Sequence, residues 1–490
     1  MTPLTLVALL GLFYSLLYLA DTVLRTNPST STRYLVTLRR LGLEVSLLSV
    51  RWSTARYNTS LQSVAEFRPR LTRLWFSVGG LVSSVLVLPS CLLLLFSLYQ
   101  HTQPSQSSQS SQTSQPLIQP VLPGVNLPPS HLLHYLLALL LASLYHEAGH
   151  AVAAFNCQLR MSSAGVMVAA MFPAAFVELP TAELQSRTAW QQLLVYSGGV
   201  WHNIVLALTA SLLSLSLPTL VSPLYRTGLG VSVTSLAPGS SALGPSGLEP
   251  GHLITAVQDR PVTSRRDFSL AVASLLSQPQ AGLCLSEAEV TKLSFSQTGS
   301  SHHQPCCPAD RPDCLCFSTQ NSPARCLPVR PLIEVAGEGR GGWCLHTCEA
   351  GPLECWTPRL ESNTTNLLVL TRRDHKHFLY IGNPAILYTE LSVSEFVPVW
   401  SWLPPAAPDI CLDFLSYLSA FSAGLAVLNV VPSYLLDGQH IVRVLVEILL
   451  QHKSPGTRLT VTAGLTMLGS LLVALNIILG LVSLTTNPLL

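Results

Sequence analysis

Charged residues are scarce in this sequence. Asp, Glu, Lys and Arg make up 11% of its 490 residues, whereas an ordinary soluble domain carries about 25%. Hydrophobic residues reach 48%, and they gather in uncharged runs that are long enough to cross a bilayer. These features exclude an ordinary soluble protein and predict a polytopic α-helical membrane protein, with the lipid bilayer as a partner.

A basic surface is missing as well. The formal net charge is only +2, and no stripe of Lys and Arg interleaved with aromatic residues occurs along the chain. Proteins that bind DNA or RNA carry such a footprint because they neutralise phosphates. We therefore exclude nucleic acid as a direct partner.

The N-terminus lacks the basic residues that open a signal peptide. Residues 4–20 form an uncharged run, which predicts a retained membrane anchor; a cleaved signal peptide is the alternative. Arginines then dominate residues 25–73, which the positive-inside rule places in the cytosol. A glycosylation sequon at Asn58 would instead require the lumen. We interpret residues 1–73 as an anchor span followed by a basic loop.

The second apolar segment, residues 74–100, has no charged side chain and is long enough to span. Pro89 either kinks this span or makes the segment re-entrant. The chain then becomes almost entirely Ser, Gln and Thr up to residue 119. Such a tract is too poor in apolar side chains to fold, so we expect residues 74–130 to be a span followed by a flexible loop.

The strongest motif is His146-Glu147-Ala148-Gly149-His150, at the end of an uncharged run. On a helix the two histidines lie four residues apart on one face, so both imidazoles reach one Zn²⁺ while Glu147 points toward the water that the metal activates. Ionisable groups at membrane depth are costly and usually functional. The motif predicts an intramembrane zinc hydrolase site with one Zn²⁺ per chain, His146 and His150 as ligands, and Glu147 as the catalytic base.

Two more segments of the predicted catalytic membrane core, residues 131–222, adjoin this motif. Residues 165–178 are apolar but interrupted by Gly and Pro, which predicts a hairpin that dips into the membrane beside the metal. The next span carries Asn203 one turn after a Gly pair. This asparagine either packs against another helix or donates a hydrogen bond into the site.

The third metal ligand is expected from residues 406–490, the second half of the core. Asp437 follows an uncharged run, and a carboxylate at that depth needs a cationic partner. A catalytic zinc keeps three protein ligands and an open position, so Asp437 would complete the set begun by His146 and His150. A last uncharged run over residues 459–484 makes the sixth predicted span.

A large domain of soluble type, residues 223–405, separates the two halves of the core. Short strands alternate with Gly/Pro turns there. Residues 248–262 resemble the signature of a PDZ domain, with His252 where that signature has Asp. We therefore expect an inserted PDZ-like, mixed α/β domain, although the departure at His252 leaves peptide binding open.

A cysteine-rich insertion lies within this domain. Residues 284–355 hold nine of the 12 cysteines, which favours disulfides in an oxidising compartment over the alternative of a second zinc site. The sequon at Asn363 is a candidate glycosylation site and agrees with a lumenal placement.

These motifs together resemble the site-2 protease family of intramembrane zinc metalloproteases. The HExxH helix, the G-x-x-x-N element from Gly199 to Asn203, the PDZ-like insertion and Leu436-Asp437-Gly438 carry the resemblance. The Ser/Gln tract and the cysteine-rich insertion resemble the animal members of the family in particular.

The resemblance implies a function and a location. Such enzymes cut the membrane span of transcription factor precursors after another protease has cut in the lumen, and so release the cytosolic factor in sterol and ER-stress regulation. The expected substrates are single-span membrane proteins in ER or Golgi membranes, with Asn203 as a substrate or oxyanion contact. Counting spans from a lumenal cysteine-rich domain places the zinc toward the cytosolic side. Residues 166–170 would hold unwound substrate as an added strand.

Two other classes stay open. A catalytically silent receptor or chaperone of the same fold would hold clients with its PDZ-like domain. Intact His146, Glu147, His150 and Asp437 argue against this class, since a silent relative usually loses at least one of them. A prenyl-protein zinc protease also has HExxH in a membrane. That class takes its third ligand from a Glu, and it lacks both the Leu-Asp-Gly element and a PDZ-like insertion.

Overall fold

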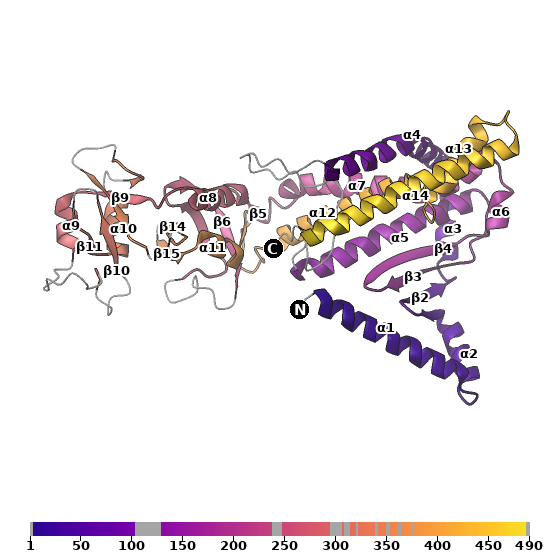
Figure 1. Ribbon diagram of the computed structural model, residues 1–490, viewed down its shortest axis with the longest axis horizontal. Coiled ribbons are helices and arrows are strands. Elements are labelled where there is room, and N and C mark those ends of the chain that lie inside the picture. The colour runs from indigo at the N-terminus through magenta and orange to yellow at the C-terminus, as the bar shows by residue number, and fades with distance from the viewer. Residues whose placement is uncertain are drawn as a thin grey trace. The chain divides into compact units, whose positions relative to one another are not determined.

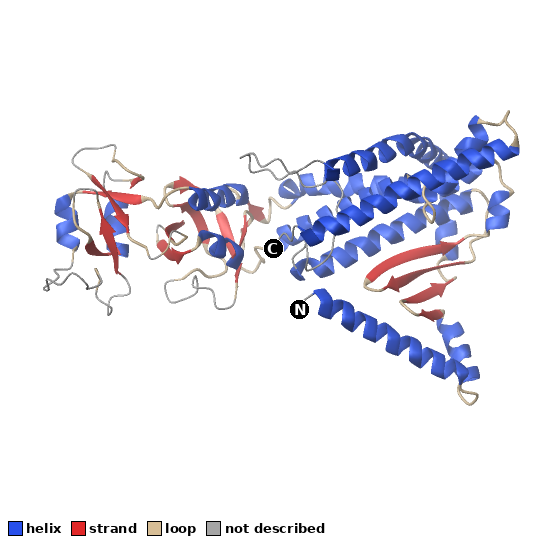
Figure 2. Cartoon of the chain, viewed as in Figure 1, coloured by secondary structure: helices blue, strands red, loops and turns tan. Residues whose placement is uncertain are grey.

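The protein folds into two compact units, Met1–Leu215 with Leu412–Leu490, and Ser216–Cys411. In the computed structural model the first unit is mainly helical and the second holds most of the strands (Figure 2). Most of the Ser/Gln tract, residues 103–119, and the candidate glycosylation site Asn363 lie outside the described residues. The structure describes residues 3–102, 129–237, 247–294, 306–307, 314–319, 322–338, 342–348, 353–360, 362, 364–374 and 376–486.

Six helices in the described part of the chain are long and apolar enough to cross a membrane. Their Leu-, Val- and Ala-rich sequences combine helix-forming side chains with hydrophobicity on all faces. The fold predicted from composition, a polytopic α-helical membrane protein with a separate sheet-rich region, is therefore confirmed. The six helices are α1 (Pro3–Thr26), α4 (Pro69–Thr102), α5 (Leu132–Asn156), α7 (Ala189–Leu220), α12 (Ala407–Val430) and α14 (Pro455–Thr486).

The helix α4 continues through Pro89 without a break. Of the two alternatives that the sequence left open for this segment, the structure shows the full span and not the re-entrant turn. A proline inside a membrane helix is tolerated when neighbouring groups satisfy the freed backbone. The residues before and after α4 can thus lie on opposite sides of a bilayer.

A four-stranded antiparallel sheet lies beside α5 (Figure 1). Its outer hairpin is the one predicted for residues 165–178. The two strands before it come from the basic loop, where the sequence analysis expected none. The strands, in sheet order, are β1 (Leu43–Ser46), β2 (Ser49–Thr54), β3 (Ser163–Ala169) and β4 (Phe172–Glu178).

The pairing of β2 with β3 joins segments that are far apart in the sequence. It runs from Ser49 opposite Ala169 to Thr54 opposite Ala164. Because paired strands share one environment, the basic loop and the hairpin after α5 lie on the same side of the helical bundle. The Tyr14 hydroxyl of α1 donates to the carbonyl oxygen of Ala170 at 2.7 Å and ties the first span to the tip of this hairpin.

One prediction about this sheet is wrong. Residues 166–170 were expected to offer a free edge to substrate, but β3 is paired with β2 on one side and β4 on the other. The edge strand is β4, which packs along α5. Sequence periodicity identified the hairpin but not its neighbour β2, whose pairing spans more than a hundred residues.

Three short helices complete the first unit. In α3, the Asn58 side-chain amide donates to the carbonyl oxygen of Met161 at 2.9 Å and holds the helix near the hairpin. Helix α13 follows α12 and packs its buried Ile441 and Val444 against α7 and α12. These helices are α2 (Ser31–Leu41), α3 (Asn58–Phe67) and α13 (Asp437–Leu449); a single turn, α6 (Thr181–Gln185), precedes α7.

The second unit contains a mixed α/β body built on a six-stranded sheet. The order is β15-β14-β7-β6-β16, with β8 paired to β7. His252, which stands where the PDZ signature has Asp, accepts a hydrogen bond on Nδ1 from the Glu249 N–H at 2.9 Å, so the imidazole serves this turn as a carboxylate would. The elements are β6 (Val231–Leu236), β7 (Leu253–Val257), β8 (Arg260–Pro261), α8 (Arg265–Ser277), β14 (Asn366–Arg372), β15 (His377–Gly382), α11 (Pro384–Glu390) and β16 (Leu391–Ser394), with the small pair β5 (Tyr225–Arg226) and β17 (Val397–Pro398).

The cysteine-rich insertion forms a second sheet within this unit. Its five strands, in the order β11-β10-β13-β9-β12, cover a core around Phe317 and Trp356. The elements are β9 (Gly282–Leu285), α9 (Glu287–Leu293), β10 (Cys314–Ser318), β11 (Arg325–Pro328), α10 (Val329–Glu338), β12 (Trp343–Cys344) and β13 (Glu354–Pro358).

Four disulfides close this insertion, as the cysteine density predicted. They use eight of its nine cysteines, and Cys314, the ninth, is buried. The two close cysteine groups that could suggest a second zinc site consist of bridged residues, whose sulfurs are not the thiolates that zinc requires. The bridges are Cys284–Cys348, Cys306–Cys316, Cys307–Cys326 and Cys344–Cys355.

Candidate active site

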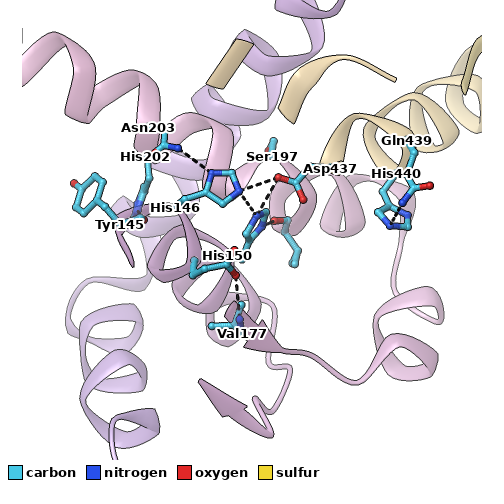
Figure 3. A network of polar contacts seen from close by, with 12 residues as sticks. Tyr145, His146, His150, Val177, Ser197, His202, Asn203, Asp437, Gln439 and His440 are labelled. Atoms are coloured by element: carbon cyan, nitrogen blue, oxygen red, sulfur yellow. Dashed lines mark hydrogen bonds and ion pairs between the residues drawn. The ribbon is translucent and has the colours of Figure 1, made fainter. Parts of the chain in front are cut away.

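The HExxH motif lies in the second half of α5. A Leu- and Ala-rich sequence without Gly or Pro before the motif favours a continuous helix there. His146 and His150 are consequently one turn apart, with ring centroids 4.8 Å from each other, and both are buried. Asp437, distant in sequence, enters the same place as the first residue of α13 (Figure 3).

Three side-chain atoms converge at this point. His146 Nε2 lies 3.0 Å from Asp437 Oδ2, and His150 Nε2 lies 3.2 Å from the same oxygen. The two Nε2 atoms are 3.1 Å apart. Ligand atoms about 2.0–2.1 Å from a tetrahedral Zn²⁺ would lie about 3.3 Å from one another. The triangle therefore fits a single zinc ion with one position left open.

A glycine opposite the triangle keeps space for such an ion. The α carbon of Gly199 faces both imidazoles, and a Cβ added to it would stand 2.4 Å from His150 Nε2 and 2.6 Å from His146 Nε2. Real Cβ atoms do not approach other atoms that closely. The Gly pair noted in the sequence thus has a specific role, because any side chain at 199 would occupy the space that the ligand atoms face.

The tautomer of His150 is fixed by the backbone of α7. Its Nδ1 lies 2.7 Å from the Val195 carbonyl oxygen, which can only accept a hydrogen bond, so Nδ1 carries the proton. The lone pair of Nε2 is then free for a metal. Such a second hydrogen bond orients the ring and raises the basicity of the ligand.

Asn203 performs the same task for His146. Its side-chain amide is completely buried, with one amide position 3.1 Å from His146 Nδ1. A zinc ligand must keep its Nε2 lone pair, so Nδ1 must donate and the amide oxygen must be the acceptor. When the amide nitrogen faces His146 instead, Asn203 Oδ1 is buried without a hydrogen-bond partner. The oxygen and nitrogen of an amide are told apart by their hydrogen-bond partners. The asparagine therefore fits a positioning role toward His146.

Glu147 lies on the side of α5 that faces the sheet. Its Oε2 accepts a hydrogen bond from the Val177 N–H of β4 at 3.1 Å. One turn earlier, Ser143 Oγ accepts from the Ala175 N–H at 2.7 Å. The edge strand β4 is thus hydrogen-bonded to α5 directly beside the candidate ligands. Only the prediction that the hairpin borders the metal pointed to this contact.

Close packing of α5 on α7 makes these contacts possible. A Cβ on Gly149 would stand 2.3 Å from the Gly198 carbonyl oxygen, so only glycine allows this approach. Beside it, the His202 ring stacks on Tyr145 at 4.8 Å and on Phe76 at 5.5 Å. Glycines in two apolar runs are typical of a close contact between membrane helices, so this contact could have been predicted from the sequence.

Helix α13 is fastened to α7 one turn beyond Asp437. The Arg443 guanidinium donates to Gln192 Oε1 at 3.1 Å and to the Tyr196 hydroxyl at 3.3 Å. The His440 ring stacks on Tyr196 at 4.7 Å. These contacts fix the start of α13, and with it the carboxylate of Asp437. None of these four residues stood out in the sequence: Arg443, Gln192, Tyr196 and His440.

Of the six site residues that the sequence predicted, five lie together. His146, Glu147 and His150 share α5, Asp437 joins them from α13, and Asn203 contacts His146. The sixth, Asn363, lies outside the described residues and stays a prediction.

Comparison with known proteins agrees with this geometry. The model of peptidase family M50 matches residues 134–475, well over half of the chain and all five clustered site residues. The membrane-bound transcription factor site-2 protease homolog of Arabidopsis thaliana is 23% identical over 428 residues, and the match covers 75% of this chain and 79% of that protein. The HExxH motif, the carboxylate on α13 and the spans α7 and α12 all fall within the matched region. The chain therefore belongs to peptidase family M50, a family of zinc-dependent membrane proteases.

Proposed function

We propose that this protein is an intramembrane zinc endopeptidase that cuts the membrane span of single-span transcription factor precursors. The close grouping of His146, His150 and Asp437 among helices apolar enough to span a bilayer carries the proposal. The name of the Arabidopsis relative supports the substrate class. By analogy with the site-2 protease family, cleavage follows a first cut in the lumen and releases the cytosolic factor in sterol and ER-stress regulation.

His146, His150 and Asp437 would hold one Zn²⁺. When bound, zinc supplies Lewis acidity, which lowers the pKa of a water molecule toward neutrality and polarises the scissile carbonyl. Glu147 Oε2 would take the proton of the attacking water and pass it to the leaving amine. Asn203 and the Val195 carbonyl would keep the two imidazoles in the ligating tautomer.

The substrate must unwind before it can react. A helical span hides its carbonyl groups in hydrogen bonds to the residue four positions later, so the scissile bond has to leave the helix. The edge of β4 lies against α5 beside Glu147, and strand addition is a common way to hold an extended peptide. We therefore assign the peptide-holding role to β4 in place of residues 166–170.

The same proposal covers placement in the cell. With six spans and β2 paired to β3, residues 25–73 and the hairpin would face one compartment. The arginines favour the cytosol as that compartment. The unit from 223 to 405 then lies in the lumen of the ER or Golgi, where its disulfides are stable. Residues 131–222 and 406–490 form the two halves of the catalytic core, with the metal toward the cytosolic side.

The decisive experiment compares two proteins in liposomes. A fluorescent single-span substrate, already trimmed on its lumenal side, is incubated with the wild type or with Glu147→Gln, and zinc content is measured in both. We expect cleavage by the wild type only, with equal zinc in both, because the amide removes the base and not a ligand. Equal cleavage by both proteins would contradict the assignment.

A second measurement separates ligands from the base. Asp437→Ala removes a donor atom from the triangle, so we expect loss of both zinc and cleavage. Full zinc occupancy in Asp437→Ala would remove this residue from the ligand set. A silent receptor of the same fold would show no cleavage in the wild type, so the variant would have none to lose. The intact group of Glu147, both histidines and Asp437 argues against such a receptor.

A further inference from the structure

The edge of β4 that faces α5 has no unpaired N–H at three alternating positions, 173, 175 and 177. Pro173 has no N–H to offer. The N–H of Ala175 donates to Ser143 Oγ at 2.7 Å, and the N–H of Val177 donates to Glu147 Oε2 at 3.1 Å. The other edge of the strand is paired with β3 over its full length. Two side chains of α5 thus take the place that the carbonyl groups of a neighbouring strand would have.

The spacing of the two side chains matches that of a strand. Ser143 and Glu147 are four residues apart on a helix, which is a rise of about 6 Å. Ala175 and Val177 are two residues apart on a strand, a distance of about 6.6 Å. A helix can therefore serve both donors at once. Without such acceptors, two N–H groups would stay without partners at membrane depth, where lipid cannot replace them.

We propose that Ser143 and Glu147 substitute for a substrate strand in the resting enzyme, and that pairing of an unwound substrate with β4 releases Glu147 to act as the base. This inference rests on the function proposed above and deepens it. The carbonyl groups of the substrate take the N–H groups of Ala175 and Val177. The Glu147 carboxylate, whose Oε2 is held by the Val177 N–H in the resting enzyme, is then free to turn toward the attacking water.

This arrangement couples catalysis to the presence of extended substrate. A peptide that stays helical offers no carbonyl groups to β4, so it leaves Glu147 engaged. Insertion of a strand requires β4 and α5 to separate by about 4.8 Å, the spacing of neighbouring strands. Ser143 becomes a positioning residue, because it acts through β4 and touches neither the scissile bond nor the metal ligands.

Binding to inactive variants tests the inference without any cleavage. Substrate affinity is measured with a fluorescent single-span peptide in nanodiscs. In Glu147→Gln the amide oxygen still accepts from Val177, whereas in Glu147→Ala no side chain competes with the substrate for the Val177 N–H. We expect Glu147→Ala to bind about two- to tenfold more tightly than Glu147→Gln, the range of one exchanged hydrogen bond.

The second arm tests Ser143 in the same inactive background. Ser143→Ala added to Glu147→Gln should also tighten binding about two- to tenfold. A purely structural cap predicts the opposite, since its loss would loosen β4 and weaken binding. The matched control is Ser84→Ala in α4, where the hydroxyl bonds only to the Gly80 carbonyl of its own helix at 2.7 Å; it should leave affinity unchanged.

The outcomes separate this inference from the proposed function. If neither Glu147→Ala nor Ser143→Ala with Glu147→Gln binds more tightly than Glu147→Gln alone, the substitution of α5 side chains for substrate is overturned, even when the wild type cleaves. If the wild type fails to cleave, the proteolytic function is lost, while the binding comparison still reports whether the edge of β4 receives a peptide.

Discussion

At the scale of single residues, the candidate site depends on glycine as much as on the ligands. Gly149 and Gly198 bring α5 and α7 into contact, and Gly199 leaves space between the imidazoles. The ligand atoms are held by partners that cannot easily move, since His150 is fixed by a backbone carbonyl and His146 by a buried amide. An intruding methyl group therefore cannot be accommodated by rotation of the rings.

Gly199→Ala should prevent zinc binding. The new Cβ would stand within 2.6 Å of both Nε2 atoms, so we expect zinc content and cleavage to fall by roughly tenfold or more, at least as much as the loss of an outer-shell partner. Zinc is measured by mass spectrometry on protein purified from the membrane. Gly80→Ala is the control, because its Cβ would meet Leu194 at an ordinary 3.5 Å. Wild-type zinc in Gly199→Ala would show that the ion is not held at this triangle.

At the scale of elements, the pairing of β2 with β3 places the basic loop and the hairpin after α5 on one side of the helical bundle. The sequence offered two conflicting signals for residues 25–73, the arginines and the sequon at Asn58. In the structure, the Asn58 amide donates to the Met161 carbonyl oxygen at 2.9 Å, and the adjacent β2 is part of the sheet beside α5. The Asn58 side chain is thus engaged within the fold, which agrees with the cytosolic placement proposed from the arginines.

Glycosylation should distinguish the two sequons. Asn363→Gln is expected to remove a glycan and to lower the mass of protein made in animal cells, because the unit that contains it is proposed to be lumenal. Asn58→Gln should leave the mass unchanged, since its side is proposed to face the cytosol. Gel mobility with and without a glycosidase gives the answer. A glycan on Asn58 would reverse the proposed orientation.

At the scale of the whole molecule, the two units differ in what stabilises them. The membrane unit depends on helix packing, whereas the cysteine-rich insertion is cross-linked by four bridges. The insertion has only a small sheet and core, and cross-links add stability by restricting the unfolded chain.

Mass mapping of the unreduced protein should recover these bridges. We expect linked peptides for Cys284 with Cys348, for Cys344 with Cys355, and for the pair of bridges that start at Cys306 and Cys307. Thiol labelling before digestion is the companion measurement. If every cysteine of the insertion were open to alkylation, both the bridges and the lumenal placement would be wrong.

The choice of substrate should follow the cost of unwinding. Gly weakens a helix by about 1 kcal/mol and Pro by about 3 kcal/mol relative to Ala, so cleavable spans should carry such residues near the cut. Replacing them with Leu should slow cleavage about fivefold or more per Gly while affinity for the intact span changes little. Rates on a matched pair of spans, one all-Leu and one with a central Gly-Pro, test this. Equal rates would contradict an unwinding step.

The sequence by itself determined the parts that depend on local spacing. Six apolar runs gave the spans because a bilayer sets their length, and His146 and His150 fell on one face because a helix repeats every 3.6 residues. The chemistry of catalytic zinc then pointed to Asp437 as a third ligand. The cysteine count indicated disulfides but not their partners.

Only the tertiary structure decided the parts that depend on contacts between distant segments. The pairing of β2 with β3, the hydrogen bonds from β4 to Ser143 and Glu147, and the cradle at Gly199 each join residues tens to more than a hundred positions apart. Periodicity carries no information about such partners, because one edge strand can pair with many others. For the same reason residues 166–170 could be recognised as a strand, but not as an inner strand of a sheet whose edge beside α5 is β4.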